Sequence, residues 1–216
     1  MSCPLCACSA GLGEGRGFGE GRYLLCGECR LISVDPRHHL CREDEKSRYE
    51  KHHNRPDDAG YVDFLSRLLR PMRPLLNGAM RGLDYGCGPG PVLSELMRRE
   101  GFSCEDYDPL FKNRPLDPPY DYILSTECFE HFRNPGGEIG ELCALLAPGG
   151  LLGIMTGLWT RIESFAEWDY VRDATHISFF HERTMAYVGR KYRMRILYTE
   201  GQRVVIFRRD PGDCGS

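Results

Sequence analysis

The spacing of apolar residues divides the chain into segments that predict helices and segments that predict strands. From Tyr61 onward, apolar residues recur at helical spacing, at positions 61, 64, 65, 68 and 69, and the pattern stops at Pro71. Short apolar runs that begin at Gly82, Phe102 and Tyr120 predict strands, and positions 92, 93, 96 and 97 predict a helix after the first strand. Strands that alternate with helices are typical of an α/β fold.

One uncharged stretch, Leu142 to Thr160, is long enough to cross a bilayer as a helix. Its centre is Pro148-Gly149-Gly150, which breaks a helix, so the stretch predicts a buried helix, a turn and a buried strand. We therefore expect no membrane span. The last part of the chain, from Arg183 to Arg209, predicts a helix and then an antiparallel hairpin around Glu200-Gly201-Gln202.

Composition and charge narrow the function classes further. The chain has 216 residues, 27% of them charged, and a net charge of -3 at pH 7. This length allows one domain with a small module, and the near-neutral balance gives no electrostatic reason to expect nucleic acid or an anionic membrane as partner. The eleven cysteines are an odd number and no signal-peptide pattern precedes them, so we expect a cytoplasmic protein whose thiols bind metal or stay buried.

Four cysteines near the N-terminus form two matched pairs. Two residues separate Cys3 from Cys6, and two residues separate Cys26 from Cys29. Each pair can turn both thiolates toward one point, so the two pairs predict a tetrahedral zinc site with four sulfur ligands. Such a site has no open position for water or substrate, so the expected Zn²⁺ is structural. Cys8 is an alternative ligand that the spacing leaves open.

The chain divides into three predicted parts. Residues 1–41 form the zinc ribbon, residues 42–80 form a helical connector or lid, and residues 81–216 form the main domain. The connector begins with Arg42 to Lys51, which is dense in charges of both signs and predicts a solvated helix.

The most informative segment of the main domain is a turn with three alternate glycines, Gly86, Gly88 and Gly90, between a strand and a helix. Glycines let the backbone approach a ligand closely, and the N-terminus of the helix offers unpaired N–H groups. The spacing matches neither a dinucleotide fingerprint nor a phosphate loop. Asp84, at the end of the strand, would repel phosphate but suits the ammonium group of an amino-acid cofactor.

This turn resembles the first motif of bacterial-type class I S-adenosylmethionine-dependent methyltransferases, and later segments resemble the same family in order. The strand from Phe102 ends at Asp108, which the resemblance assigns to the ribose hydroxyls of the cofactor, with Asp106 as the alternative. The resemblance covers about residues 60 to 205 and implies that residues 81–216 bind S-adenosyl-L-methionine. The residues it assigns to the cofactor are Asp84, Gly86, Cys87, Gly88, Gly90, Asp108, Thr126 and Glu127.

The chain departs from the family pattern after the second strand. The segment between Asp108 and Asp121 is short and holds four prolines, whereas a crossover with its own strand needs about a dozen residues or more. The fold class is therefore α/β, a Rossmann-like class I methyltransferase sheet with its third strand short or missing. A C-terminal antiparallel hairpin and a small N-terminal zinc ribbon complete the expected fold.

Residues 158–181 contain both tryptophans of the chain and several other aromatic residues, without a clear period. Because ligands of an open α/β sheet bind beyond the carboxyl ends of the strands, this segment is a candidate wall for the methyl acceptor. The alternative is that Trp168, Phe179 and Phe180 form a satellite core.

Histidine titrates near neutrality, so His176 in this aromatic segment is the candidate general base for methyl transfer. Tyr170 is a second catalytic candidate and Glu127 a weaker one, whereas we expect His131 mainly to hold the turn after its strand. A structural histidine that is hydrogen-bonded to the backbone is the alternative for His176.

The sequence favours a methyltransferase that acts on a small or medium-sized acceptor. Two alternatives stay open. One is an RNA methyltransferase that uses the zinc ribbon to dock its substrate, and the other is a non-catalytic adaptor that uses the ribbon for protein contacts. The acceptor atom and the oligomeric state do not follow from the sequence.

Overall fold

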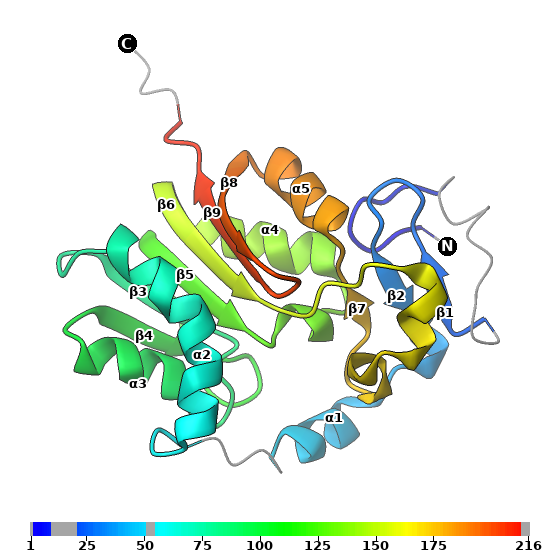
Figure 1. Cartoon of the computed structure of the whole chain (residues 1–216), viewed down its shortest axis with the longest axis horizontal. Helices are drawn as coiled ribbons and strands as arrows, with labels where there is room; N and C mark the ends of the chain where they lie inside the picture. The colour runs from blue at the N-terminus through cyan, green and yellow to red at the C-terminus, as the bar shows by residue number, and fades with distance from the viewer. Residues whose placement is uncertain (1, 10–20, 51–54, 213–216) are drawn as a thin grey trace.

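The computed structural model describes residues 2–9, 21–50 and 55–212. Within these residues the main sheet has six strands in the order β4-β3-β5-β6-β9-β8 (Figure 1). Strands β3 to β6 run parallel, and β9 pairs antiparallel with both β6 and β8, which confirms the predicted α/β sheet with its C-terminal hairpin. The strands are β3 (Arg81–Tyr85), β4 (Ser103–Tyr107), β5 (Tyr120–Thr126), β6 (Leu146–Met155), β8 (Met194–Glu200) and β9 (Val204–Arg209).

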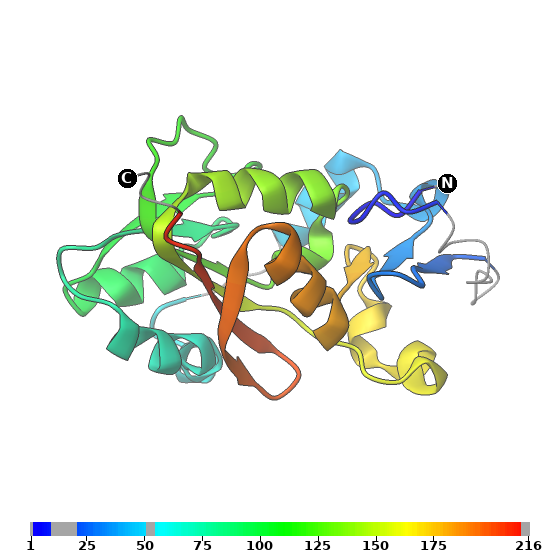
Figure 2. The same cartoon turned by 90° about the horizontal axis from the view of Figure 1, so that it is seen from above.

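Different pairs of helices cover the two faces of this sheet (Figures 1 and 2). The pair α2 (Ala59–Met72) and α3 (Val92–Arg99) packs on one face, and α4 (Pro135–Leu145) and α5 (Glu182–Lys191) pack on the other. Residues alternate between the faces, as in any strand: Tyr122 and Leu124 of β5 join the α2 and α3 side, whereas Ile123 joins the α4 and α5 side.

Strand β4 lies at one edge of the sheet because no strand forms between residues 108 and 120. The next strand of the chain, β5, pairs with the opposite side of β3. The prediction that the third strand is short or missing is therefore confirmed. The proline-rich segment in its place makes only one isolated bridge, between Asp108 and Lys112.

The N-terminal ribbon shares a small sheet with a distant part of the chain. Its strands β1 (Tyr23–Leu25) and β2 (Ile32–Val34) pair antiparallel, and β2 also pairs with β7 (Ser178–Phe179). After β2 comes α1 (Arg42–Tyr49), the first helix of the predicted connector. The three-part division stays a prediction, but one sheet joins its first part to its third.

Two local predictions were wrong. Pro148-Gly149-Gly150 lies inside β6 rather than in a turn before it, because Gly149 adopts a φ of +76° and the pairing with β5 shifts in register at this point. Helix α2 continues one residue past Pro71, since a proline in the last turn costs a single backbone hydrogen bond. The short 3-10 helices are Pro36–His38, Arg73–Leu75, Phe129–His131, Ile162–Glu167 and Asp169–Arg172.

The uncharged stretch that is long enough for a membrane span forms parts of a helix and a strand instead. Over the described ranges, no helix has both the length and the apolar character needed to cross a membrane.

Candidate active site

A cavity of about 750 Å³ lies at the carboxyl ends of β3, β4 and β5. This is where the ligand of an open α/β sheet binds. The lining includes all eight residues that the sequence assigned to the cofactor, and also His176 and Tyr170. We call the part around Asp84, Gly86, Gly88 and Asp108 the glycine-turn side, and the part around Glu130, Tyr170 and His176 the histidine side.

The glycine turn has two positions that only glycine fits well. Gly86 and Gly88 adopt φ values of +79° and +65°. A Cβ atom on Gly86 would lie 2.3 Å from Sγ of Cys128, so the turn packs directly on the second residue after β5. A Cβ atom on Gly88 would meet nothing within 4 Å, so the space in front of this residue is open to a ligand.

Asp84 is fully buried at the end of β3 and lines the cavity. The backbone N–H of Ser94 donates a hydrogen bond to its carboxylate over 3.2 Å. Burial nevertheless raises the pKa of Asp84 to about 7 because the charged form loses its hydration. A cationic ligand group beside this carboxyl would favour ionisation, which fits the ammonium group of S-adenosylmethionine.

Asp108, rather than Asp106, faces the cavity. The backbone N–H of Gly88 donates to one carboxylate oxygen of Asp108 over 3.0 Å, and the N–H groups of Leu110 and Phe111 donate to the other over 2.8 and 3.1 Å. Asp108 thus ties the glycine turn to the loop after β4. Asp106 is instead occupied by ion pairs with Arg98 at 3.0 Å and Lys112 at 3.1 Å.

On the histidine side, the ring of His176 has a defined tautomer. Its Nδ1 atom lies 2.6 Å from the backbone oxygen of Tyr170, which only accepts hydrogen bonds, so Nδ1 carries the hydrogen and Nε2 carries the lone pair. Burial lowers the pKa of His176 from its usual value of 6.5, so the ring is neutral at pH 7. A neutral imidazole with an available Nε2 atom is able to accept a proton.

A buried carboxylate that the sequence reasoning missed, Glu130, lies behind Tyr170 on this side and does not itself line the cavity. The hydroxyl groups of Thr156 and Tyr170 donate to the two oxygens of Glu130, the first over 2.7 Å. Burial raises the pKa of Tyr170 well above 10, so this hydroxyl stays protonated and acts as a donor. Glu130 follows the end of a predicted strand closely, as Asp108 does. This position after a strand is the feature of the sequence that could have identified Glu130 as a site residue.

Glu127 and Arg203 form an ion pair of 2.8 Å in the cavity wall. Glu127 adopts a φ of +47°, and burial raises its pKa to about 8, with repulsion from Glu130 as the next cause. The guanidinium group of Arg203 lies over the rings of Phe64 and Tyr170, at 5.6 and 5.4 Å from their centroids. Sequence reasoning missed Arg203 because its hairpin turn is distant in the chain from the other lining residues.

Among the residues that the structure describes, two groups of side chains are suitably placed to hold a metal ion. Ligand atoms of Glu130, His131 and His176 all lie within 4.8 Å of one another on the histidine side. Nδ1 of His131 is 3.0 Å from the backbone oxygen of Thr175, so this histidine joins the turn after β5 to the segment before β7. The second group is the cluster of Cys3, Cys6, Cys26 and Cys29.

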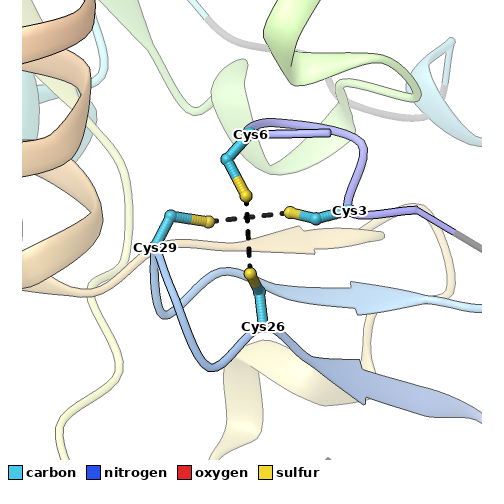
Figure 3. A group of neighbouring side chains, drawn as sticks. All are labelled: Cys3, Cys6, Cys26 and Cys29. Carbon is cyan, nitrogen blue, oxygen red and sulfur yellow. Dashed lines mark hydrogen bonds between the residues drawn. The ribbon is translucent and has the colours of Figure 1, made fainter. Parts of the chain in front are cut away.

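The four sulfur atoms of this cluster point toward one another (Figure 3). The distance is 3.6 Å between the sulfurs of Cys3 and Cys29 and 3.5 Å between those of Cys6 and Cys26. A tetrahedral zinc site with Zn–S bonds of about 2.3 Å has sulfurs about 3.8 Å apart, so the cluster fits this ion closely. Cys8, the alternative ligand, is not part of the cluster.

Most aromatic residues of the segment 158–181 belong to the core. Phe179 packs with Trp159 and Phe165 against β2, and Phe180 belongs to the core under α5. Trp168 stacks on Tyr170 with 4.7 Å between the ring centroids. The satellite-core alternative thus describes Phe179 and Trp168, Phe180 belongs to the main core, and Tyr170 and His176 form part of the cavity wall.

Comparisons with known proteins agree with this geometry. The family model described as "Methyltransferase domain" matches residues 51–192. A ubiquinone biosynthesis O-methyltransferase of Caulobacter sp. (strain K31) is 34% identical over 103 residues, which cover 36% of this chain and 40% of that protein. The corresponding enzyme of Caulobacter vibrioides is 32% identical over 100 residues and is covered to 39%. The chain thus matches less than half the length of these relatives.

Solved structures share the fold at low sequence identity. Magnesium protoporphyrin IX methyltransferase of Synechocystis PCC 6803, with bound S-adenosylhomocysteine, superposes with a TM-score of 0.56 at 13% identity. This match covers 78% of the present chain and 94% of that chain. An O-methyltransferase family protein of Burkholderia thailandensis gives a TM-score of 0.53 at 19% identity and covers 78% of this chain and 64% of its own.

Proposed function

Because this chain belongs to the methyltransferase domain family and has the class I S-adenosylmethionine-dependent fold, we propose that it methylates a hydroxyl group of a small acceptor. The observation that carries the proposal is the single cavity that brings the glycine turn and the neutral His176 together. The names of the Caulobacter relatives support oxygen as the acceptor atom. The aromatic lining, including Tyr49, Phe64 and Tyr170, favours an aromatic acceptor such as a phenol.

The glycine-turn side holds the cofactor in this proposal. Asp84 faces the ammonium group, and the free lone pairs of Asp108 accept the ribose hydroxyls. Gly88 leaves room for the cofactor against the backbone. S-adenosylmethionine supplies an electrophilic methyl group on a sulfonium ion, so the protein has to orient the acceptor oxygen in line with the S–C bond.

His176 acts on the acceptor. Its Nε2 atom takes the proton of the hydroxyl group while the oxygen bonds to the methyl carbon and the S–C bond breaks. The products are the methyl ether, S-adenosylhomocysteine and a protonated imidazole, which then releases its proton to solvent. Tyr170 and Glu130 position this base, because the Tyr170 backbone oxygen fixes its tautomer and the Tyr170 hydroxyl is anchored on Glu130.

Two measurements test the proposal. Calorimetry with S-adenosylhomocysteine should give a micromolar dissociation constant, and an assay with radiolabelled S-adenosylmethionine and catechol should yield a labelled methyl ether. No binding at millimolar cofactor would refute the proposed enzyme. Binding without transfer to catechol, but with transfer to an RNA, would instead identify the RNA methyltransferase.

We also infer that the cysteine cluster holds one structural Zn²⁺. The ligand set and the sulfur distances support this assignment. Metal analysis of the purified protein should find one zinc per chain, and the double substitution Cys26→Ser and Cys29→Ser should remove it. Cys8→Ser is the matched control and should keep the zinc.

A further inference from the structure

Residues 169–179, which we call the histidine segment, contribute Tyr170 and His176 to the cavity wall and also contact the ribbon. Its last residues form β7, and among the described strands β7 pairs only with β2 of the ribbon. The backbone N–H of Val34 in β2 donates to the oxygen of Ile177 over 2.8 Å. The ribbon therefore supplies the backbone partner on one side of this segment.

The opposite side of the histidine segment is bound to the turn that carries Glu130. The N–H of Ile177 donates to the backbone oxygen of Glu130 over 2.8 Å, and the hydroxyl of Ser178 donates to the backbone oxygen of Phe132 over 2.8 Å. The carbonyl group of Ile177 thus accepts a hydrogen bond from the ribbon, and its N–H group donates one to the turn that carries Glu130. His176 immediately precedes Ile177, so both attachments restrain the backbone next to this histidine.

The two cysteine pairs fix the ribbon to the main domain. In the first pair, the backbone oxygen of Pro4 accepts from the N–H of Gly136 over 3.0 Å, and that of Leu5 accepts from Nζ of Lys191 over 2.7 Å. A Cβ atom on Gly136 would lie 2.8 Å from both oxygens, so the first pair sits tightly on α4. The second pair leads directly into β2, with the N–H of Cys26 bonded to the oxygen of Leu31 over 2.8 Å.

We propose that the zinc ribbon positions the catalytic histidine: metal at the four cysteines joins α4 to β2, and β2 holds the histidine segment against Glu130. This role rests on the methyl transfer and the zinc loading proposed above. The ribbon is then a fixed wall behind the acceptor, rather than a module free to dock RNA or another protein. Loss of the metal separates the two cysteine pairs and releases β2, the partner of Ile177 and Phe179.

None of the hydrogen bonds described above joins the glycine-turn side to the ribbon. Every hydrogen-bond partner given above for Asp84 and Asp108 lies between residues 88 and 111. Metal loss should therefore disturb the histidine side while the cofactor affinity is retained. If the ribbon only stabilises the fold as a whole, metal loss should reduce the order of the histidine side and the cofactor affinity together.

Both tryptophans of the chain report on this region, so the test needs no acceptor. Trp159 packs in the cluster with Ile32 and Val34 of β2, under the guanidinium group of Arg30 at 5.0 Å. Trp168 stacks on Tyr170 of the histidine segment. Fluorescence emission and acrylamide quenching then measure the order of the histidine side, and calorimetry with S-adenosylhomocysteine measures the glycine-turn side.

The experiment compares the zinc-loaded full chain with protein stripped by a chelator. We expect a red-shifted tryptophan emission and at least a twofold rise in the acrylamide quenching constant, with cofactor affinity within about threefold. Added Zn²⁺ should restore the original spectrum. Unchanged emission after metal loss overturns the proposal, and so does a cofactor affinity that falls in parallel with the spectral change. Neither readout depends on methyl transfer, so this experiment can refute the positioning role of the ribbon without refuting the proposed reaction.

A second variant separates the metal from the strand pairing. Val34→Pro keeps all four cysteines but removes the N–H that bonds to Ile177. Metal analysis should still find one zinc per chain in this variant, and its emission should nevertheless shift to the red with cofactor affinity kept. A zinc-loaded Val34→Pro protein with the emission of the unchanged chain overturns the proposal, even if the stripped protein fails to fold. Cys8→Ser is the matched control and should behave as the unchanged chain.

Discussion

The two sides of the cavity are assembled in opposite ways. On the glycine-turn side, Asp84, Gly88 and Asp108 belong to one strand-turn-helix-strand unit, in which Gly88 donates to Asp108 and Ser94 donates to Asp84. On the histidine side, His176 and Arg203 of the cavity wall and Glu130 behind it come from three separate parts of the chain. A short continuous unit brings its functional groups together by local folding alone. The histidine side requires the whole domain, and this difference predicts that each side can be altered without the other.

The largest expected effect is on the histidine side. His176→Ala should lower the rate of methyl transfer about 10² to 10⁴-fold, because a positioned general base contributes that much. The affinity for S-adenosylhomocysteine should stay within about threefold. A steady-state assay and calorimetry measure the two quantities, and the exposed His38→Ala is the control. If both rate and affinity are unaffected by His176→Ala, His176 has no role in the site.

The opposite result should follow from a change on the glycine-turn side. Asp108→Ala removes an acceptor for three backbone N–H groups and for the ribose, so the affinity for S-adenosylhomocysteine should fall by about 100-fold. Tryptophan emission should stay unchanged, because the histidine side is intact. Asp106→Asn is the comparison variant. A larger loss of affinity with Asp106→Asn than with Asp108→Ala would reverse the assignment of the ribose ligand.

Asp84 should show a conflict between stability and binding. Its pKa is about 7 in the folded chain and near 4 when unfolded, so the unfolded state ionises first and the free energy of unfolding falls as pH rises from about 4 to 7. Asp84→Asn removes this penalty and should raise the free energy of unfolding at pH 8 by about 2 to 4 kcal/mol. Urea unfolding at pH 8 and pH 5 should show a smaller gain at the lower pH.

The same substitution should weaken cofactor binding, since the amide has no charge for the ammonium group. A variant that is less stable than the original chain at pH 8 would contradict the assignment of Asp84 as a carboxylate whose burial opposes ionisation.

The smallest expected effect is the pH dependence of the rate at saturating cofactor. Burial lowers the pKa of His176 below 6.5, so the rate should fall on acidification with a midpoint below pH 6.5, about tenfold per pH unit beyond it. The charged groups that face the ring are Glu130 and Asp173, which raise its pKa, and His131, which lowers it. An acid limb centred above pH 6.5 would mean that the carboxylates outweigh burial. Absence of the limb would remove His176 as the base.

The sequence allowed much of the sheet and the glycine-turn side to be predicted, for a physical reason. Asp84, the glycines and Asp108 are fixed by a strand, a turn and a helix whose residues are close in the chain. Local conformational preferences and hydrophobic periodicity are therefore sufficient to predict most of this side of the cavity. The two CxxC pairs have the same property, because each pair is a local turn.

The histidine side was predicted only in part. His176 stood out by its chemistry, but Glu130 and Arg203 acquire their positions through contacts that no local pattern encodes. Pro148 and the glycines after it illustrate the converse, because the local turn signal lies inside β6, at the irregularity where its pairing with β5 shifts in register. The pairing of β2 with β7 also joins residues that are far apart in the chain. Tertiary contacts decide such features, so the sequence read alone misses them.

The short sheet edge has a consequence for how the protein behaves at high concentration. Strand β4 lies where an interior strand would normally have a neighbour, and open strand edges promote association between copies. Here Glu105 is flanked by Arg81 at 2.8 Å and by Arg114, and Asp106 by Arg98 and Lys112. Another strand has to desolvate these charged groups before it can pair with β4. The shortened fold thus has ion pairs at the edge where a further strand would otherwise pair.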